Sequence, residues 1–166
     1  MKNTIIFLSI LFITASGCQK EPDNIKIDTS SQKDASKTQF KKQGEVYFQD
    51  SLKTLIKKID VEIADNDNAR HQGLMYREGM SEDQGMLFIF QSEEQQSFYM
   101  KNTVLPLDII FVNAKKQIVK IHKNTEPFSE KTLPSVKPAL YVVEVNAGFT
   151  DKFKIKEGGH IDWRRN

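Results

Sequence analysis

The 166-residue chain has no surplus of charge of one sign and only one cysteine. Its 24 Lys and Arg residues nearly balance 22 Asp and Glu residues, and the two signs are interspersed. A nucleic-acid surface needs clustered basic residues, so we expect no nucleic-acid partner. A single cysteine forms no disulfide within one chain, so the fold must be stabilised by packing alone.

Sets of residues that bind metals or cofactors are also missing. The three histidines, His71, His122 and His160, share no short ligand spacing with one another, whereas a metal site needs ligands that converge. No serine lies in a Gly-x-Ser-x-Gly sequence, and no glycine-rich phosphate loop occurs. The sequence therefore predicts no metal site, no cofactor and no serine nucleophile.

The N-terminus has the pattern of a secretory signal. Lys2 supplies a short positive region, an apolar run follows at 5–13, and small residues occupy 15–17. The run is too short to span a bilayer, which takes about 20 residues. Small residues followed by Cys18 resemble a bacterial lipobox, although Ala15 stands where lipoboxes usually carry leucine. The resemblance implies cleavage before Cys18, lipidation of its thiol, and an exported protein anchored to a membrane at the cell envelope.

Three regions follow one another along the chain. We expect a signal peptide of the lipoprotein type at 1–17, a flexible polar tether at 18–43 and a single β-domain at 44–166. The tether is rich in Lys, Asp, Ser, Gln and Thr, which bury too little apolar surface to fold. Most of the 11 Phe, 4 Tyr and 1 Trp residues lie in the third region, which can therefore build a hydrophobic core.

Strand patterns dominate the third region. Apolar and polar residues alternate at 59–64, as in a half-buried strand with its polar side exposed. Further strands are expected at 86–90, 98–101, 107–112, 117–122, 140–145 and 161–163. The segment 113–116 predicts a hairpin turn, and 123–138, with three prolines, predicts a long surface excursion. With only two short helical segments, one ending near Arg77 and one at 150–153, the pattern predicts a mainly β fold, a compact sandwich or barrel.

The stretch SFYMKNTVLPLDIIFVN, at 97–113, places one lysine and one aspartate between apolar runs. Pro106 cannot donate to a sheet ladder, so the chain is expected to turn at 103–106. If the flanking strands pair as a hairpin about this turn, Lys101 faces Asp108. A strand that is apolar on both sides is usually buried, so its carboxylate needs a partner. The favoured interpretation is a structural ion pair between the two residues.

Two functional interpretations of the same region remain open. The candidate ligand-binding residues are Arg77, Met100, Lys101, Asn102 and Asp108. The donors among them would surround a small anionic or carbonyl ligand, with methionines at 75, 86 and 100 as its apolar wall. Alternatively, Lys101 and Asp108 would act as the acid–base residues of a small hydrolase or lyase.

Five sequence blocks, at 73–77, 85–90, 97–103, 106–111 and 141–148, closely resemble the domain-of-unknown-function family 192 in order and spacing. The resemblance covers about 59–161 and implies a mainly β, jelly-roll-like fold. It implies no activity, because the family has no established one. Tyr99 stands where the family often has tryptophan, and the cysteines that some members carry in the segment matching 126–138 are absent.

Together these features favour an uncharacterised, membrane-tethered extracytoplasmic lipoprotein whose domain binds a small ligand or an envelope protein without catalysis. The hydrolase or lyase built on Lys101 and Asp108 is one alternative, and a purely structural envelope module is another. A binding module predicts an apolar pocket rimmed by Arg77, Lys101 and Asn102, whereas an enzyme predicts that solvent reaches Asp108. An aspartate sealed against Lys101 or backbone amides would remove the support for catalysis.

Overall fold

The computed structural model describes residues 39–166, so the expected signal peptide, Cys18 and most of the tether lie outside the described residues. Seven strands and two short helices are present. They are β1 (Gly44–Gln49), β2 (Leu55–Ala64), α1 (Asp67–Gln72), β3 (Gln84–Phe98), β4 (Leu107–Val112), β5 (Ile118–His122), β6 (Leu133–Asn146), α2 (Phe149–Lys152) and β7 (His160–Arg165). Neither helix has the length and hydrophobicity to cross a bilayer.

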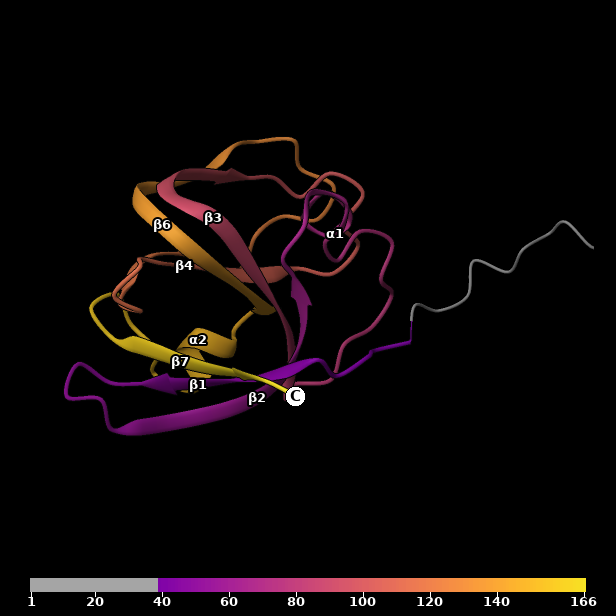
Figure 1. Ribbon diagram of the computed structural model, residues 1–166. Coiled ribbons are helices and arrows are strands. Elements are labelled where there is room, and N and C mark those ends of the chain that lie inside the picture. The colour runs from indigo at the N-terminus through magenta and orange to yellow at the C-terminus, as the bar shows by residue number, and fades with distance from the viewer. Residues whose placement is uncertain (1–38) are drawn as a thin grey trace, which may run out of the picture. The chain divides into compact units, whose positions relative to one another are not determined.

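All seven strands belong to one sheet, in the order β5-β4-β6-β3-β2-β1-β7. Only β2 and β3 pair in parallel; the other neighbours are antiparallel. The sheet curls into a half-barrel (Figure 1). An isolated bridge joins Gln117, just before β5, to His160 of β7. The predicted mainly β fold with one or two short helices is confirmed.

The sheet separates two hydrophobic cores because successive side chains of a strand point to opposite faces. The first core, on the concave side with α2, includes Val46, Phe48, Val143, Val145 and Phe149. The second core, on the side of α1, includes Leu74, Phe88, Met100, Ile109 and Val142. Strand β4 is buried along its whole length, since it contributes to both cores.

Strand β3 bends sharply midway, and this bend shapes the second core. Ten residues of straight strand would span about 33 Å, yet the rings of Phe88 and Phe98 lie 5.1 Å apart, edge to face. The pairing of β3 with β6 shifts register between Ile89 and Glu94 and again between Gln95 and Ser97, as expected of β-bulges, which bend a strand. The bend therefore carries Phe98 back over the first half of its own strand.

Helix α1 is short because its ends are fixed by local chemistry. The side chain of Asn66 accepts the N–H of Ala69 at 3.0 Å, which caps the first turn. Gly73 has a φ of 46°, a conformation that favours glycine and ends the helix. The helix thus stops at Gln72 rather than near Arg77, and the next residues form a turn that lies against the second core.

Several expected elements differ from the structure. The strand expected at 98–101 is absent, because β3 ends at Phe98 and a loop follows. The expected surface excursion at 123–138 contains the first part of β6, whose prolines fall where its pairing with β3 is irregular. Glu62, expected on the exposed side of its strand, is buried by Arg77. The hairpin turn at 113–116 is confirmed by the pairing of β4 with β5.

Candidate functional site

Asp108 is fully buried on β4 and serves to hold α2 against the sheet. Its Oδ1 accepts the backbone N–H of Asn124 at 2.9 Å and of Gly148 at 3.2 Å. Its Oδ2 accepts the N–H of Thr150 at 2.9 Å and its hydroxyl at 2.7 Å. Gly148 is the N-cap of α2 with a φ of 83°, which favours glycine there. Asp108 is therefore a structural cap, sealed from solvent by backbone amides.

The hairpin register that placed Lys101 opposite Asp108 is wrong. Strand β4 pairs with β5 and β6, and Lys101 lies in the exposed loop after β3. The carboxylate nearest to its ammonium is that of Glu130, at 3.5 Å, on the surface. Because the structure does not bring Lys101 and Asp108 together, it offers no support for a hydrolase that uses them as a pair.

The other candidate ligand-binding residues have separate structural roles. Arg77 is 4% exposed and pairs with Glu62, which also accepts the N–H of Lys41 at 2.9 Å. Met100 is packed in the second core. Asn102 has a φ of 56°, and its carbonyl accepts the N–H of Tyr76 at 2.8 Å. The loops that carry Arg77 and Asn102 thus touch, while the side chain of Arg77 pairs with Glu62 and that of Lys101 with Glu130.

An open pocket of about 240 Å³ lies instead on the outer side of the sheet, between α1, the bend of β3 and the loop that follows β3. Its apolar and aromatic wall consists of Leu74, Met75, Phe88, Phe90, Phe98 and Tyr99. Polar side chains of Arg70, His71, Gln72, Ser97, Thr103 and Glu144 complete the lining. A cavity that combines an apolar wall with polar groups able to orient a ligand is typical of a small-molecule site.

Glu144 supplies the buried acid of this pocket. It lies on β6, paired with Met86 on one side and Ile109 on the other, and is 5% exposed. Strands β3 and β6 approach closely there, since a Cβ on Gly85 would stand 2.6 Å from the carbonyl oxygen of Glu144. Burial raises the pKa of the Glu144 carboxyl from 4.5 to about 8, and no hydrogen bond or neighbouring charge offsets that burial.

The cation beside this pocket is already engaged. Arg70 donates to the carbonyl oxygen of Ile89 at 2.8 Å and to the carboxylate of Asp67 at 2.5 Å. Its guanidinium also lies over the ring of Phe90, 5.4 Å from the centroid. The charge of Arg70 is therefore balanced by its neighbours, while Glu144 has no such partner.

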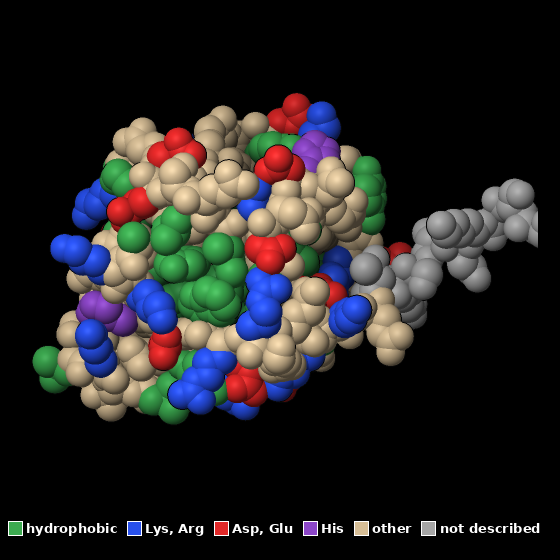
Figure 2. Space-filling view, in the orientation of Figure 1, with side chains coloured by type: hydrophobic (Ala, Val, Ile, Leu, Met, Phe, Trp, Pro, Cys, Tyr) green, Lys and Arg blue, Asp and Glu red, His purple; other side chains and the backbone are tan. Residues whose placement is uncertain are grey.

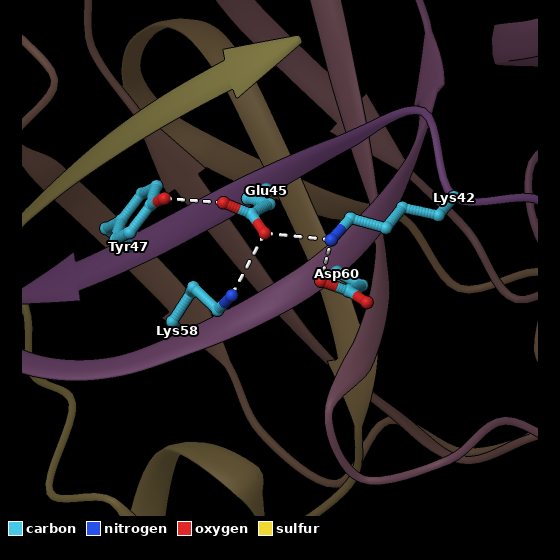
Figure 3. A network of polar contacts seen from close by, with 5 residues as sticks. All are labelled: Lys42, Glu45, Tyr47, Lys58 and Asp60. Atoms are coloured by element: carbon cyan, nitrogen blue, oxygen red, sulfur yellow. Dashed lines mark hydrogen bonds and ion pairs between the residues drawn. The ribbon is translucent and has the colours of Figure 1, made fainter. Parts of the chain in front are cut away.

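A network of five polar side chains lies elsewhere, on the exposed outer face of β1 and β2. Figure 3 shows Glu45 accepting hydrogen bonds from Lys42 at 2.8 Å, Tyr47 at 2.5 Å and Lys58 at 2.9 Å. These contacts, led by the one from Lys42, lower the pKa of the Glu45 carboxyl to about 2. Lys42 also pairs with Asp60 at 2.8 Å. The network fixes the first strand to the second and lines no pocket described above.

Charge elsewhere is mixed. Figure 2 shows basic and acidic side chains interspersed around a central cluster of hydrophobic side chains on the face that it presents. Within residues 39–166, no three His, Cys, Asp or Glu side chains are placed to hold a metal ion.

Glu144 was not among the ligand-binding candidates chosen from sequence, where it was considered only as a second carboxylate that could approach Asp108. The signal was present, since Glu144 is the only charged residue in the apolar run 140–145. The same signal drew attention to Asp108 at 107–112. An acid inside an apolar run is expected to be buried, but only the structure shows that Asp108 has donors around it and that Glu144 accepts no hydrogen bond from the described residues.

Comparisons with known proteins agree with this fold. The family model for DUF192, described as Uncharacterized ACR, matches residues 49–163. No curated protein matches the chain. A solved structure of a candidate transcription regulator from Sinorhizobium meliloti 1021 is 35% identical, with a TM-score of 0.70, over 75% of this chain and 95% of its own. A protein of unknown function from Novosphingobium aromaticivorans DSM 12444 is 32% identical, with a TM-score of 0.68, over 72% of this chain and 84% of its own.

The family match covers more than half of the chain and includes every strand from β2 to β6, with the pocket and Glu144 inside it. The expected resemblance is thereby confirmed, and this chain belongs to the DUF192 family.

Proposed function

We propose that this protein is a lipid-anchored, extracytoplasmic binding module that captures a small, mainly apolar ligand in the pocket between α1 and the bend of β3. The observation that carries the proposal is the Glu144 carboxyl, which is 5% exposed, lines an open pocket and accepts no hydrogen bond from the described residues. An unpaired buried acid costs stability, and perturbed acids in clefts are concentrated at functional sites.

The dimensions and lining of the pocket support a small ligand. A cavity of about 150 Å³ is large enough for benzene, so a space of about 240 Å³ accepts one ring with a short polar extension. The aromatic wall offers contact area, and Glu144, Ser97 and Thr103 offer hydrogen bonds. The ligand-contacting residues in this proposal are therefore those of the pocket, in place of Arg77, Lys101 and Asn102.

The proposal is tested by screening a fragment library, with equal numbers of amines, neutral amides and carboxylates, against the ¹⁵N-labelled full chain. Binding should shift the amide resonances of Phe98, Tyr99 and Glu144 together. Ser97→Trp places an indole at the pocket and should abolish these shifts. Ser92→Trp is the matched control, because Ser92 is exposed on the same strand and outside the pocket lining. A library in which no fragment shifts the pocket resonances contradicts the proposal, as does binding that persists in Ser97→Trp.

One observation favours catalysis as a second candidate function. A carboxyl with a pKa raised to about 8 suits a general acid near neutral pH. No base or nucleophile among the described residues accompanies it by hydrogen bonding, which is why binding is the better-supported function. Chromatography of each bound fragment after prolonged incubation separates the two, since an enzyme converts its ligand and a binding module returns it unchanged.

The relative described as a candidate transcription regulator does not lead us to propose DNA binding. The formal charge of this chain is +2, and the face in Figure 2 mixes both signs. A DNA-binding surface would gather lysine and arginine on one face.

The anchor is tested separately from the pocket. Wild-type protein expressed in its native host should fractionate with membranes, and Cys18→Ser should release it into the soluble envelope fraction. Retention of Cys18→Ser on membranes would contradict the anchor and leave the pocket proposal intact.

A further inference from the structure

The pocket combines two features that together select one ligand chemistry. One is a wall of aromatic rings, formed by Phe88, Phe90, Phe98 and Tyr99. Phe88 is almost fully buried and Arg70 already lies over the ring of Phe90, so Tyr99, which is 42% exposed, is the ring most open to a ligand. The other is the Glu144 carboxyl, the only acidic side chain of the lining. Aromatic faces attract cations through the ring quadrupole, and a buried carboxylate is stabilised by an opposite charge.

An anionic ligand fits this lining poorly. It would bring a second negative group beside Glu144, and the guanidinium of Arg70 is already occupied by Asp67, Ile89 and the ring of Phe90. A neutral carbonyl ligand would accept a hydrogen bond from the protonated carboxyl but gain little from the aromatic wall. A cation gains from both features.

On these grounds we propose that the ligand is a small amine, bound as its ammonium ion, with the nitrogen paired to the Glu144 carboxylate and its apolar body against the aromatic wall. This inference rests on the pocket being a ligand site and names the chemical class of the ligand. The anionic or carbonyl ligand expected from sequence is thereby replaced.

Binding of an amine displaces a proton. In the free protein at neutral pH the carboxyl of Glu144 is mostly protonated, because its pKa lies near 8. The ammonium ion arrives already protonated, so ion pairing requires that Glu144 lose its proton to solvent, one per ligand bound. Affinity should therefore rise about tenfold from pH 6 to pH 7 and level off above pH 8.

Other ionisable groups face the same space and must be separated from Glu144. Arg70, with its partner Asp67, and His71 come from α1, and the Glu62–Arg77 pair lies two strands away on the same face. Histidine is the side-chain type in this set whose charge changes most readily near neutral pH. His71→Gln is therefore the control that must keep the pH dependence.

The test uses three probes with the same ring and different polar ends: 2-phenylethylamine, 3-phenylpropanamide and 3-phenylpropanoate. Affinity for the full chain is measured by calorimetry from pH 6 to pH 8, in buffers of different ionisation enthalpy that count protons released. We expect the amine to bind most tightly and to release close to one proton at pH 7. Glu144→Gln should weaken the amine at least tenfold at pH 8 and remove its pH dependence. Glu78→Gln, an equal change at an exposed position, should do neither.

The outcomes separate this inference from the proposed function. If the amide or the acid binds the pocket as tightly as the amine, or if Glu144→Gln leaves amine affinity unchanged, the amine assignment is overturned while the pocket remains a ligand site. If none of the three probes binds and the fragment library also fails, the proposed function falls with it. Should Glu144→Gln fail to fold, proton release and the pH profile of the wild type decide the assignment alone.

Discussion

Glu144→Gln should become increasingly stable relative to the wild type as the pH rises, whereas removal of a carboxylate that forms a stabilising ion pair has the opposite effect. Burial raises the pKa of Glu144 from 4.5 to about 8. Between these two pH values the folded protein keeps a proton on Glu144 that the unfolded chain has released. The free energy of unfolding of the wild type therefore falls as pH rises through this range and stops falling above pH 8.

The magnitude follows from the same values. Each pH unit in the middle of the range costs the wild type about 1.4 kcal/mol, and less near the two pKa values. From pH 5 to pH 8 the loss from this one group is therefore about 3–4 kcal/mol. Glutamine is neutral at every pH and does not contribute to this slope. The contributions of other titrating groups cancel when the variant is compared with the wild type at each pH, provided that they do not interact with position 144.

Urea denaturation of both proteins at pH 5, 6, 7 and 8, at one ionic strength, provides the measurement. The stability of Glu144→Gln relative to the wild type should increase by about 3–4 kcal/mol across the series. Glu78→Gln, at an exposed position, should show no such increase. Parallel profiles for Glu144→Gln and the wild type would refute the conclusion that Glu144 is buried without a partner.

Three further predictions concern the polar groups outside the pocket. Asp108→Asn should lower the free energy of unfolding by about 3 kcal/mol in urea denaturation, since it weakens charge-assisted hydrogen bonds to α2. Lys101→Met should change the same free energy by less than about 0.5 kcal/mol. If the effects of the two substitutions are not additive in the double mutant, Lys101 and Asp108 interact after all. Arg77→Met should cost about 3–5 kcal/mol by the same assay, because it leaves Glu62 buried without its cation; a small loss would mean that the pair is not buried in solution. Glu45→Gln should change the melting temperature little, because its exposed pairs contribute little, and a large loss would show that the network of Figure 3 does more than fix β1 to β2.

Local patterns were sufficient for the elements whose cause is local. The turn at 113–116 joins strands that pair as a hairpin, and the apolar run at 86–90 lies in a buried part of β3, as the spacing predicts. The pairing of β4 with β6 was beyond sequence reasoning, because the two strands are separated by β5 and a long loop. A hairpin between 98–101 and 107–112 was the nearest local alternative, and the non-local pairing replaced it.

The same limit explains the site. Asp108 is satisfied mainly by backbone N–H groups of Asn124, Gly148 and Thr150, and backbone groups leave no side-chain signal in a sequence. The partner predicted from sequence was therefore a side chain, that of Lys101, seven residues before Asp108. The pocket was equally hidden, since it depends on the bend that brings Phe98 over Phe88.

The two buried acids lie almost side by side in the sheet and face opposite ways. Asp108 pairs with Val145 and Ile109 pairs with Glu144, so the acids are one register position apart on adjacent strands. Asp108 points to the side of α2 and receives four hydrogen bonds there. Glu144 points to the side of α1 and receives none that offsets its burial.

The fold surrounds the carboxyl of Asp108 with hydrogen-bond donors but places no donor against the carboxyl of Glu144. A leucine or methionine at position 144 would match Met86 and Ile109 beside it and remove the cost of burying the acid. Packing therefore gives no reason for a carboxyl at that position. On the proposal made above, a positive group that enters the pocket would recover the stability that Glu144 removes above pH 5, so ligand binding would account for a residue that packing does not explain.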